Sequence, residues 1–200
     1  MNVRGSPYVS LQTGSYAEPA NARATADEST EEEPVLEEFA GIPAHPLLIH
    51  APVVFVPLLA ITAVAYGFVG LIRPHTRWVL GLLALAAPLS ALLAKLSGDA
   101  LFDRLDRNGQ ITEGFYPVIE NHQNLGTTTL YATIVLGVLT LGLVYLVPPG
   151  APSVIATGDP GRRQILLLVL RVLVLAAAAV SVYYVIRTGD SGSHAVWEGT

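Results

Sequence analysis

Four long apolar runs constrain this chain more than any other feature of its sequence. They extend over about 47–72, 78–97, 120–147 and 164–186. Roughly 20 apolar residues in a helix are enough to cross the hydrocarbon core of a bilayer. Because lipid cannot hydrogen-bond to free backbone amides or carbonyls, an apolar run that crosses it in this way must be helical. The sequence therefore predicts an all-α polytopic membrane protein, a bundle of four transmembrane helices in a cell membrane.

The composition agrees with the lipid bilayer as the main partner of the chain. Hydrophobic residues make up 52% of the 200 residues and charged residues 14%, whereas about a quarter of the residues of a soluble domain are charged. The net charge of −5 comes mostly from residues 1–40, which show no apolar period. We predict a disordered acidic tail over 1–40 and a transmembrane domain over 41–198. No basic patch is present to bind nucleic acid, which excludes it as a partner.

Small residues recur every four positions in two of the predicted helices. One stripe lies in the second apolar run and the other in the third: Ala86, Ser90, Ala94 and Gly98, then Thr129, Thr133 and Gly137. Small side chains let helices approach closely in lipid, where association depends on van der Waals packing. We expect each stripe to face another helix.

The segment between the second and third runs is polar. Residues 98–118 carry charges of alternating sign, which predicts a short solvated helix and then a turn at Asn108-Gly109. Lys95 and Asp99 are four residues apart and are expected to pair on one helix face.

The number of spans fixes which segments share a membrane face. Four spans return the chain to its starting side, so both termini lie on one face and the loops 73–77 and 148–163 lie on the other. The loops carry four arginines and a single acidic residue, Asp159. Under the positive-inside rule, this distribution predicts cytoplasmic loops and termini on the outer face.

The same count places most histidines together. Four of them, with one aspartate, lie near helix ends on the terminus side: His45, His50, Asp99, His122 and His194. His75 lies on the opposite side, where we expect an ordinary surface role. The chain has no cysteine, and its one methionine is the first residue. Cysteine-ligated and methionine-ligated cofactors are therefore excluded, and any metal must be held by histidine or carboxylate side chains.

Three functions remain open from the residues alone. In the first, His50 and His122 are axial ligands of haem b in a small membrane redox component, with His45 and His194 as further cofactor-binding candidates. In the second, His50, Asp99, His122 and His194 bind a divalent metal such as zinc. In the third, the chain is a non-catalytic subunit or scaffold, and its polar groups only hydrogen-bond helix ends. The sequence identifies no catalytic residue.

A dense motif begins the transmembrane domain: Gly41-Ile42-Pro43-Ala44-His45-Pro46-Leu47-Leu48-Ile49-His50-Ala51-Pro52. Three later features accompany it: Ser97-Gly98-Asp99, His122, and the closing segment Thr188-Gly189-Asp190-Ser191-Gly192-Ser193-His194-Ala195-Val196-Trp197. Together they resemble a family of predicted bacterial membrane proteins, domain of unknown function 2231, whose opening pattern is G-x-P-x-H-P-x-x-x-H-x-P.

This resemblance covers about residues 40–198 and implies a four-helix membrane domain without an assigned activity. Relatives in the family are fused or adjacent to Rieske-type iron–sulfur proteins. The resemblance therefore implies a redox or haem-linked setting, with such a redox subunit as a partner. Since this chain lacks cysteine, any iron–sulfur cluster would belong to that partner.

Overall fold

The computed structural model describes residues 38–39, 42–150 and 161–197, all within one compact unit of residues 33–200. In the described part, four helical spans are long and apolar enough to cross a membrane. They are formed by α1 (Ala44–Leu48) with α2 (His50–Phe68), α3 (Arg73–Arg107), α4 (Tyr116–Leu146) and α5 (Arg162–Trp197). This confirms the predicted all-α, four-span architecture. The disorder predicted for the tail falls on residues that lie almost wholly outside the described ones.

Three short elements complete the chain order. A two-residue strand, β1 (Glu38–Phe39), pairs antiparallel with β2 (Ile42–Pro43) before α1. A 3₁₀ turn, η1 (Gly70–Ile72), joins α2 to α3.

Helix α3 is longer than the sequence pattern indicated. Helix α3 begins at Arg73 and continues without a break to Arg107, so the predicted loop 73–77 and the separate polar helix are both wrong. Pro74 is suited to the first turn of a helix, and the charged residues 99–107 extend the same helix beyond its apolar part. The predicted turn is confirmed, because Gly109 has a φ of +62° and donates its N–H to the Asp106 carbonyl at 2.9 Å.

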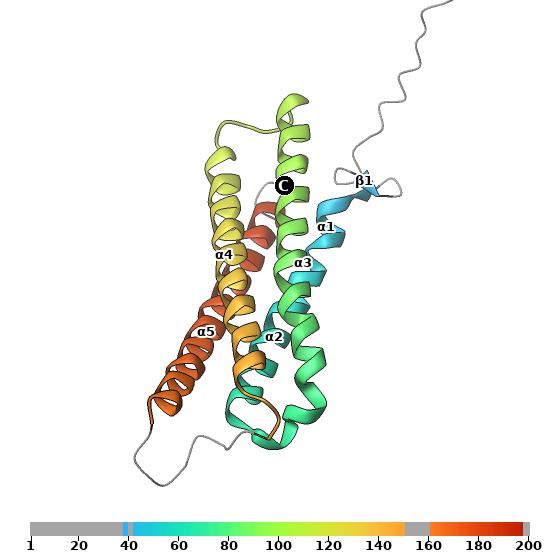
Figure 1. Cartoon of the computed structure of the whole chain (residues 1–200). Coiled ribbons are helices and arrows are strands. Elements are labelled where there is room, and N and C mark those ends of the chain that lie inside the picture. Colours follow the sequence, from blue (N-terminus) through green and yellow to red (C-terminus); the bar gives the residue numbers. More distant parts are fainter. Residues whose placement is uncertain (1–37, 40–41, 151–160, 198–200) are drawn as a thin grey trace, which may run out of the picture. The chain divides into compact units, whose positions relative to one another are not determined.

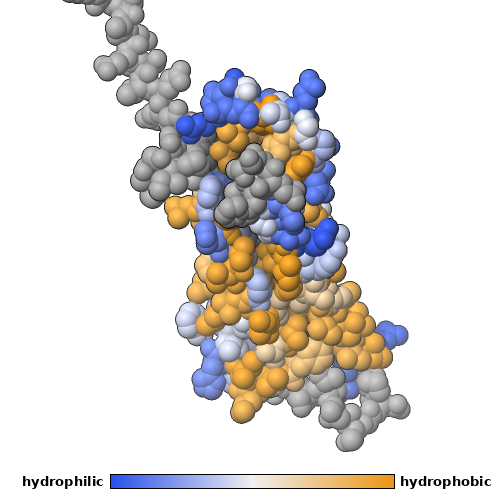
Figure 2. Space-filling model, turned by 180° about the vertical axis from the view of Figure 1, so that it is seen from behind, coloured by the Kyte–Doolittle hydropathy of each residue, from blue (hydrophilic) through white to orange (hydrophobic). Residues whose placement is uncertain are grey.

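Each long helix packs against its neighbours in sequence, and α5 closes the bundle against α2, with α2 and α4 on the diagonal (Figure 1). We call the end where α1 and α4 begin and α3 and α5 end the terminus-side face, and the opposite end the loop-side face. The outer surface between them is largely apolar, and Figure 2 shows this apolar surface below a cap of hydrophilic side chains. Large side chains such as Ile61 and Val138 are exposed on it, as expected for helices that face lipid.

Helices α3 and α4 approach each other at a glycine. A Cβ atom on Gly137 would lie 2.6 Å from the Ala84 carbonyl oxygen and 3.1 Å from Pro88 Cγ. Thr129 and Thr133, on the same face of α4, are buried. The predicted small face of the third span is therefore confirmed. Gly137 packs against α3, whereas Thr129 Oγ1 lies 2.7 Å from Thr188 Oγ1 of α5.

A buried arginine organises the loop-side face. The Arg73 side chain is fully buried and donates from Nε to the Tyr66 carbonyl at 2.9 Å and from Nη2 to the Gly67 carbonyl at 3.1 Å. These carbonyls belong to the last turn of α2, where the helix itself offers no donors. The Tyr66 hydroxyl in turn donates to the Val147 carbonyl at 2.8 Å. The ends of α2, α3 and α4 are thus tied together.

Replacing Gly137 by alanine is expected to lower the thermal unfolding midpoint. The neighbouring Ala84 oxygen belongs to the backbone and cannot rotate away, so α3 and α4 must separate, at a cost of about 1–3 kcal/mol. Gly142→Ala on the same helix is the matched control, because nothing lies within 4 Å of its Cβ position. Both variants would be melted in one detergent. An equal loss of stability in the two would contradict the close contact at Gly137.

Candidate functional site

Two histidines from different helices meet at the terminus-side face. The ring centroids of His45, in α1, and His122, in the second turn of α4, are 6.2 Å apart, with an interplanar angle of 83°. Both side chains are half-buried. The sequence had instead favoured His50 and His122 as the pair.

The orientation of the His45 ring is set by α3. Its Nδ1 lies 2.9 Å from the Ala94 carbonyl oxygen and 3.2 Å from Ser97 Oγ. A carbonyl can only accept, so Nδ1 carries the proton and donates it. A Cβ atom on Gly98 would lie 3.0 Å from His45 Cε1. Gly98, at the end of the small-residue stripe on α3, therefore leaves the space that this imidazole occupies.

The His122 ring is held in the same way by α5. Its Nδ1 lies 2.9 Å from Ser191 Oγ. The Ser191 hydroxyl donates its own hydrogen to the Thr188 carbonyl at 2.9 Å, so toward His122 it accepts. The proton of His122 is therefore also on Nδ1. A Cβ atom on Gly192 would lie 3.0 Å from His122 Cε1, which makes this glycine the counterpart of Gly98.

Both rings thus carry the proton on Nδ1. With Nδ1 donating, the other ring nitrogen, Nε2, keeps its lone pair. A histidine that ligates a metal through Nε2 typically donates its Nδ1–H to a carbonyl or similar acceptor, which fixes the ring. A metal–nitrogen bond of about 2.0–2.1 Å places two imidazoles on one ion roughly 5–6 Å apart between centroids. The spacing of 6.2 Å is slightly larger than that range.

The other predicted ligands lie around this pair. His50 is exposed, and its Nδ1 is 3.4 Å from the Leu47 carbonyl oxygen. Asp99 pairs with Lys95 at 2.5 Å, which confirms the predicted ion pair, and its charge acts on His45. His194 Nε2 is 3.7 Å from Asp190 Oδ1, and both side chains are more than half exposed. Within the described ranges, no group of three or more histidine, aspartate or glutamate residues is placed to hold a metal ion.

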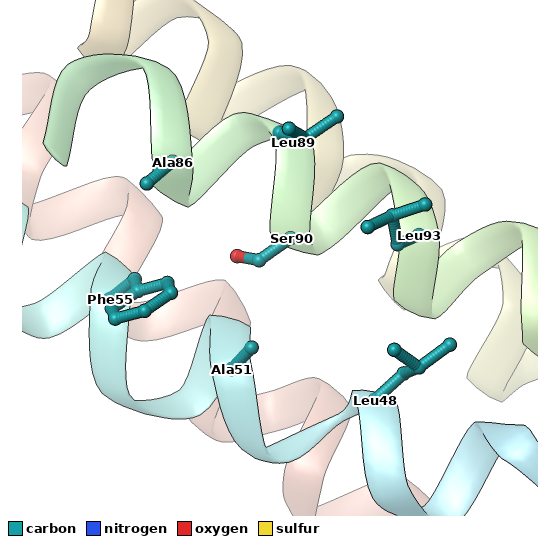
Figure 3. Close-up of a pocket in the computed structure, with 7 residues that line it drawn as sticks. All are labelled: Leu48, Ala51, Phe55, Ala86, Leu89, Ser90 and Leu93. Atoms are coloured by element: carbon teal, nitrogen blue, oxygen red, sulfur yellow. The ribbon is translucent and has the colours of Figure 1, made fainter. Parts of the chain in front are cut away.

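Two grooves flank the site. One, of about 390 Å³, lies between α4 and α5 and is lined by three apolar residues and by Asn121, Arg187, Asp190, Ser191 and His194. The other, of about 220 Å³, lies between α1–α2 and α3 (Figure 3). Its single polar group is Ser90, whose hydroxyl already donates to the Ala87 carbonyl. This second groove is therefore apolar, and its one polar side chain is already hydrogen-bonded.

The sequence matches a family model described as "Predicted membrane protein (DUF2231)" over residues 41–200. The chain belongs to this family. No curated protein matches it, and no solved structure does. The DUF2231 match includes every described residue that holds or contacts the two imidazoles. The family resemblance predicted from sequence is thus confirmed.

Sequence reasoning missed the partners of the two rings. The side chains of Ser97 and Ser191 and the bare backbones of Gly98 and Gly192 were not among the candidate site residues. A signal for them existed, because all four stand in the segments that carry the DUF2231 resemblance. A small residue in such a segment can leave the space against which a histidine from another helix packs. Only the fold shows which histidine packs against Gly98 and which against Gly192.

The ¹⁵N NMR spectrum of histidine-labelled protein is expected to show Nδ1-protonated rings for His45 and His122. Gly192→Ala places a methyl group 3.0 Å from His122 Cε1, so this variant is expected to shift the His122 signals while the exposed His50 keeps its own. Gly189→Ala, with nothing within 4 Å, is the control on the same helix. Nε2-protonated signals for both buried rings would contradict the assigned hydrogen bonds.

Proposed function

We propose that this DUF2231 protein is a small membrane redox component in which the imidazoles of His45 and His122 are the two axial ligands of haem b. The observation that carries the proposal is that both rings are protonated on Nδ1. Each donates its Nδ1–H to an oxygen, at 2.9 Å in both cases, and each keeps Nε2 for a metal. Haem b, when bound, supplies one-electron transfer.

The number of ligands favours haem over a bare divalent ion. Structural zinc sites use four protein ligands and catalytic zinc sites three. A haem iron already has four porphyrin nitrogens, so two histidines complete its coordination. In the part of the chain that the structure describes, the pair has no third histidine or carboxylate arranged with it for a metal. A zinc site therefore remains the weaker alternative.

The position of the pair supports a role in transfer to a partner. Both rings lie near the terminus-side face, within the first turn of α1 and the second turn of α4. In the orientation that the arginines at the loop-side ends of α3 and α5 favour, this face is the outer face of the cell membrane. A redox subunit such as a Rieske-type protein would dock there.

The purified protein is expected to show a reduced-minus-oxidised difference spectrum of the b type, with iron near one atom per chain. His45→Ala and His122→Ala are each expected to abolish the band, since either change removes one axial ligand. His50→Ala is the matched control, because His50 is exposed and adjacent in sequence. Circular dichroism would verify that each variant keeps its helices.

Absence of the band from wild-type protein, or its loss in His50→Ala alone, would overturn the proposal. Zinc at one atom per chain without iron would favour the divalent-metal alternative.

A further inference from the structure

A second buried arginine lies inside the bundle, on α5. Arg171 is only 4% exposed and stands nine residues after Arg162, the first residue of the helix. Its Nε atom is buried and has no hydrogen-bond partner. Arginine inside a transmembrane span is costly and normally pairs with an acceptor or a negative charge. Arg171 Nε therefore lacks the acceptor that a buried arginine requires.

Arg171 approaches the cluster that Arg73 organises. The Arg171 Cγ atom is 3.6 Å from the position of a Cβ on Gly67. Arg73 donates to the carbonyl of the same glycine at 3.1 Å. The two guanidinium charges are near enough to act on each other. Two arginine side chains from different helices therefore approach the same glycine in the loop-side half.

No described carboxylate lies on that half of the bundle. The acidic residues within the described helices and turns all belong to the terminus-side half: Asp99, Asp103, Asp106, Glu113, Glu120 and Asp190. The loop-side half carries further exposed arginines at its rim, namely Arg77, Arg162 and Arg163. The charge of Arg171 is therefore not balanced by any carboxylate that the structure describes.

We propose that Arg171, beside Arg73, binds a phosphate group at the loop-side face. A guanidinium presents a planar fork of N–H donors that matches phosphate oxygens, and a charge-assisted bond of this kind offsets the burial of the cation. Basic pockets between transmembrane helices bind anionic lipid headgroups on the cytoplasmic side, which is the loop-side face in the orientation proposed above. The phosphate comes either from such a lipid or from dissolved inorganic phosphate.

The test uses the full chain in neutral detergent and measures its thermal unfolding midpoint. A ligand that binds only the folded state raises the midpoint with concentration. Three titrations are compared: phosphatidylglycerol, phosphatidylcholine and inorganic phosphate. A rise with phosphatidylglycerol alone supports the site with a lipid source. A rise with inorganic phosphate supports the site with a soluble source. A response to none of the three, or an equal one to both lipids without phosphate, overturns the proposal.

Arg171→Gln is expected to weaken the apparent affinity for the responding anion roughly tenfold or more. Arg171→Lys keeps the positive charge but loses the planar set of guanidinium donors. It is therefore expected to fold and to bind the anion less tightly than wild type. This variant replaces Arg171→Gln in the test if the glutamine variant does not fold. Arg162→Gln, on the same helix but exposed, is the matched control and is expected to respond as wild type does. Unchanged affinity in both Arg171 variants would overturn the proposal.

Asp159 is the single acidic residue of the loop 148–163 and lies outside the described residues. If the wild-type midpoint ignores every anion while Asp159→Asn destabilises the protein as much as Arg171→Gln, the charge is paired within the chain and the proposal fails. The difference spectrum of Arg171→Gln should match that of wild type, because the paired histidines lie at the other end of the bundle.

Discussion

A bilayer offers no hydrogen-bond partners, and this constraint explains most of the structure. Buried polar groups must therefore seek their partners within the protein, and among the described residues Thr140 Oγ1, Ser181 Oγ and Arg171 Nε are buried without one. Thr129 and Thr133 return their hydroxyls to carbonyls four residues earlier in α4, at 2.9 and 2.7 Å. Arg73 uses the carbonyls that end α2. The same requirement fixes the imidazole of His45 on the Ala94 carbonyl. The site therefore follows from the way the bundle satisfies its backbone.

The bilayer also requires that the helices approach each other closely. Lipid removes the hydrophobic drive between helices, so contact depends on how closely their backbones can pack. Gly137 allows α4 to meet the Ala84 carbonyl of α3, while Gly98 and Gly192 make room for imidazoles instead of helix backbones. Small residues thus have two uses in this protein. One brings helices together, and the other leaves space for a ring.

The sequence was sufficient for the architecture and insufficient for the pairing of side chains. Apolar length alone predicted four spans, and spacing predicted the small face at Gly137 and the pair of Lys95 with Asp99. The number of spans also placed four of the five histidines, with Asp99, on one face. Choosing His45 over His50 as the neighbour of His122 required the rotation of α1 and the break at Ile49 between α1 and α2, and neither follows from a count of apolar residues. The burial of Arg171 was hidden for the same reason, because periodicity does not say which face of a uniformly apolar helix points inward.

The two polar ends of the bundle are far enough apart to act independently. From His50 to Tyr66, α2 rises about 24 Å at 1.5 Å per residue. At that separation, two unit charges interact by less than about 1 kcal/mol for an effective dielectric constant of 20. A change of charge at the arginines therefore has little electrostatic effect at the histidines. A midpoint that responds to anions then reports on the loop-side face, and an optical band reports on the terminus-side face, so either result can stand without the other.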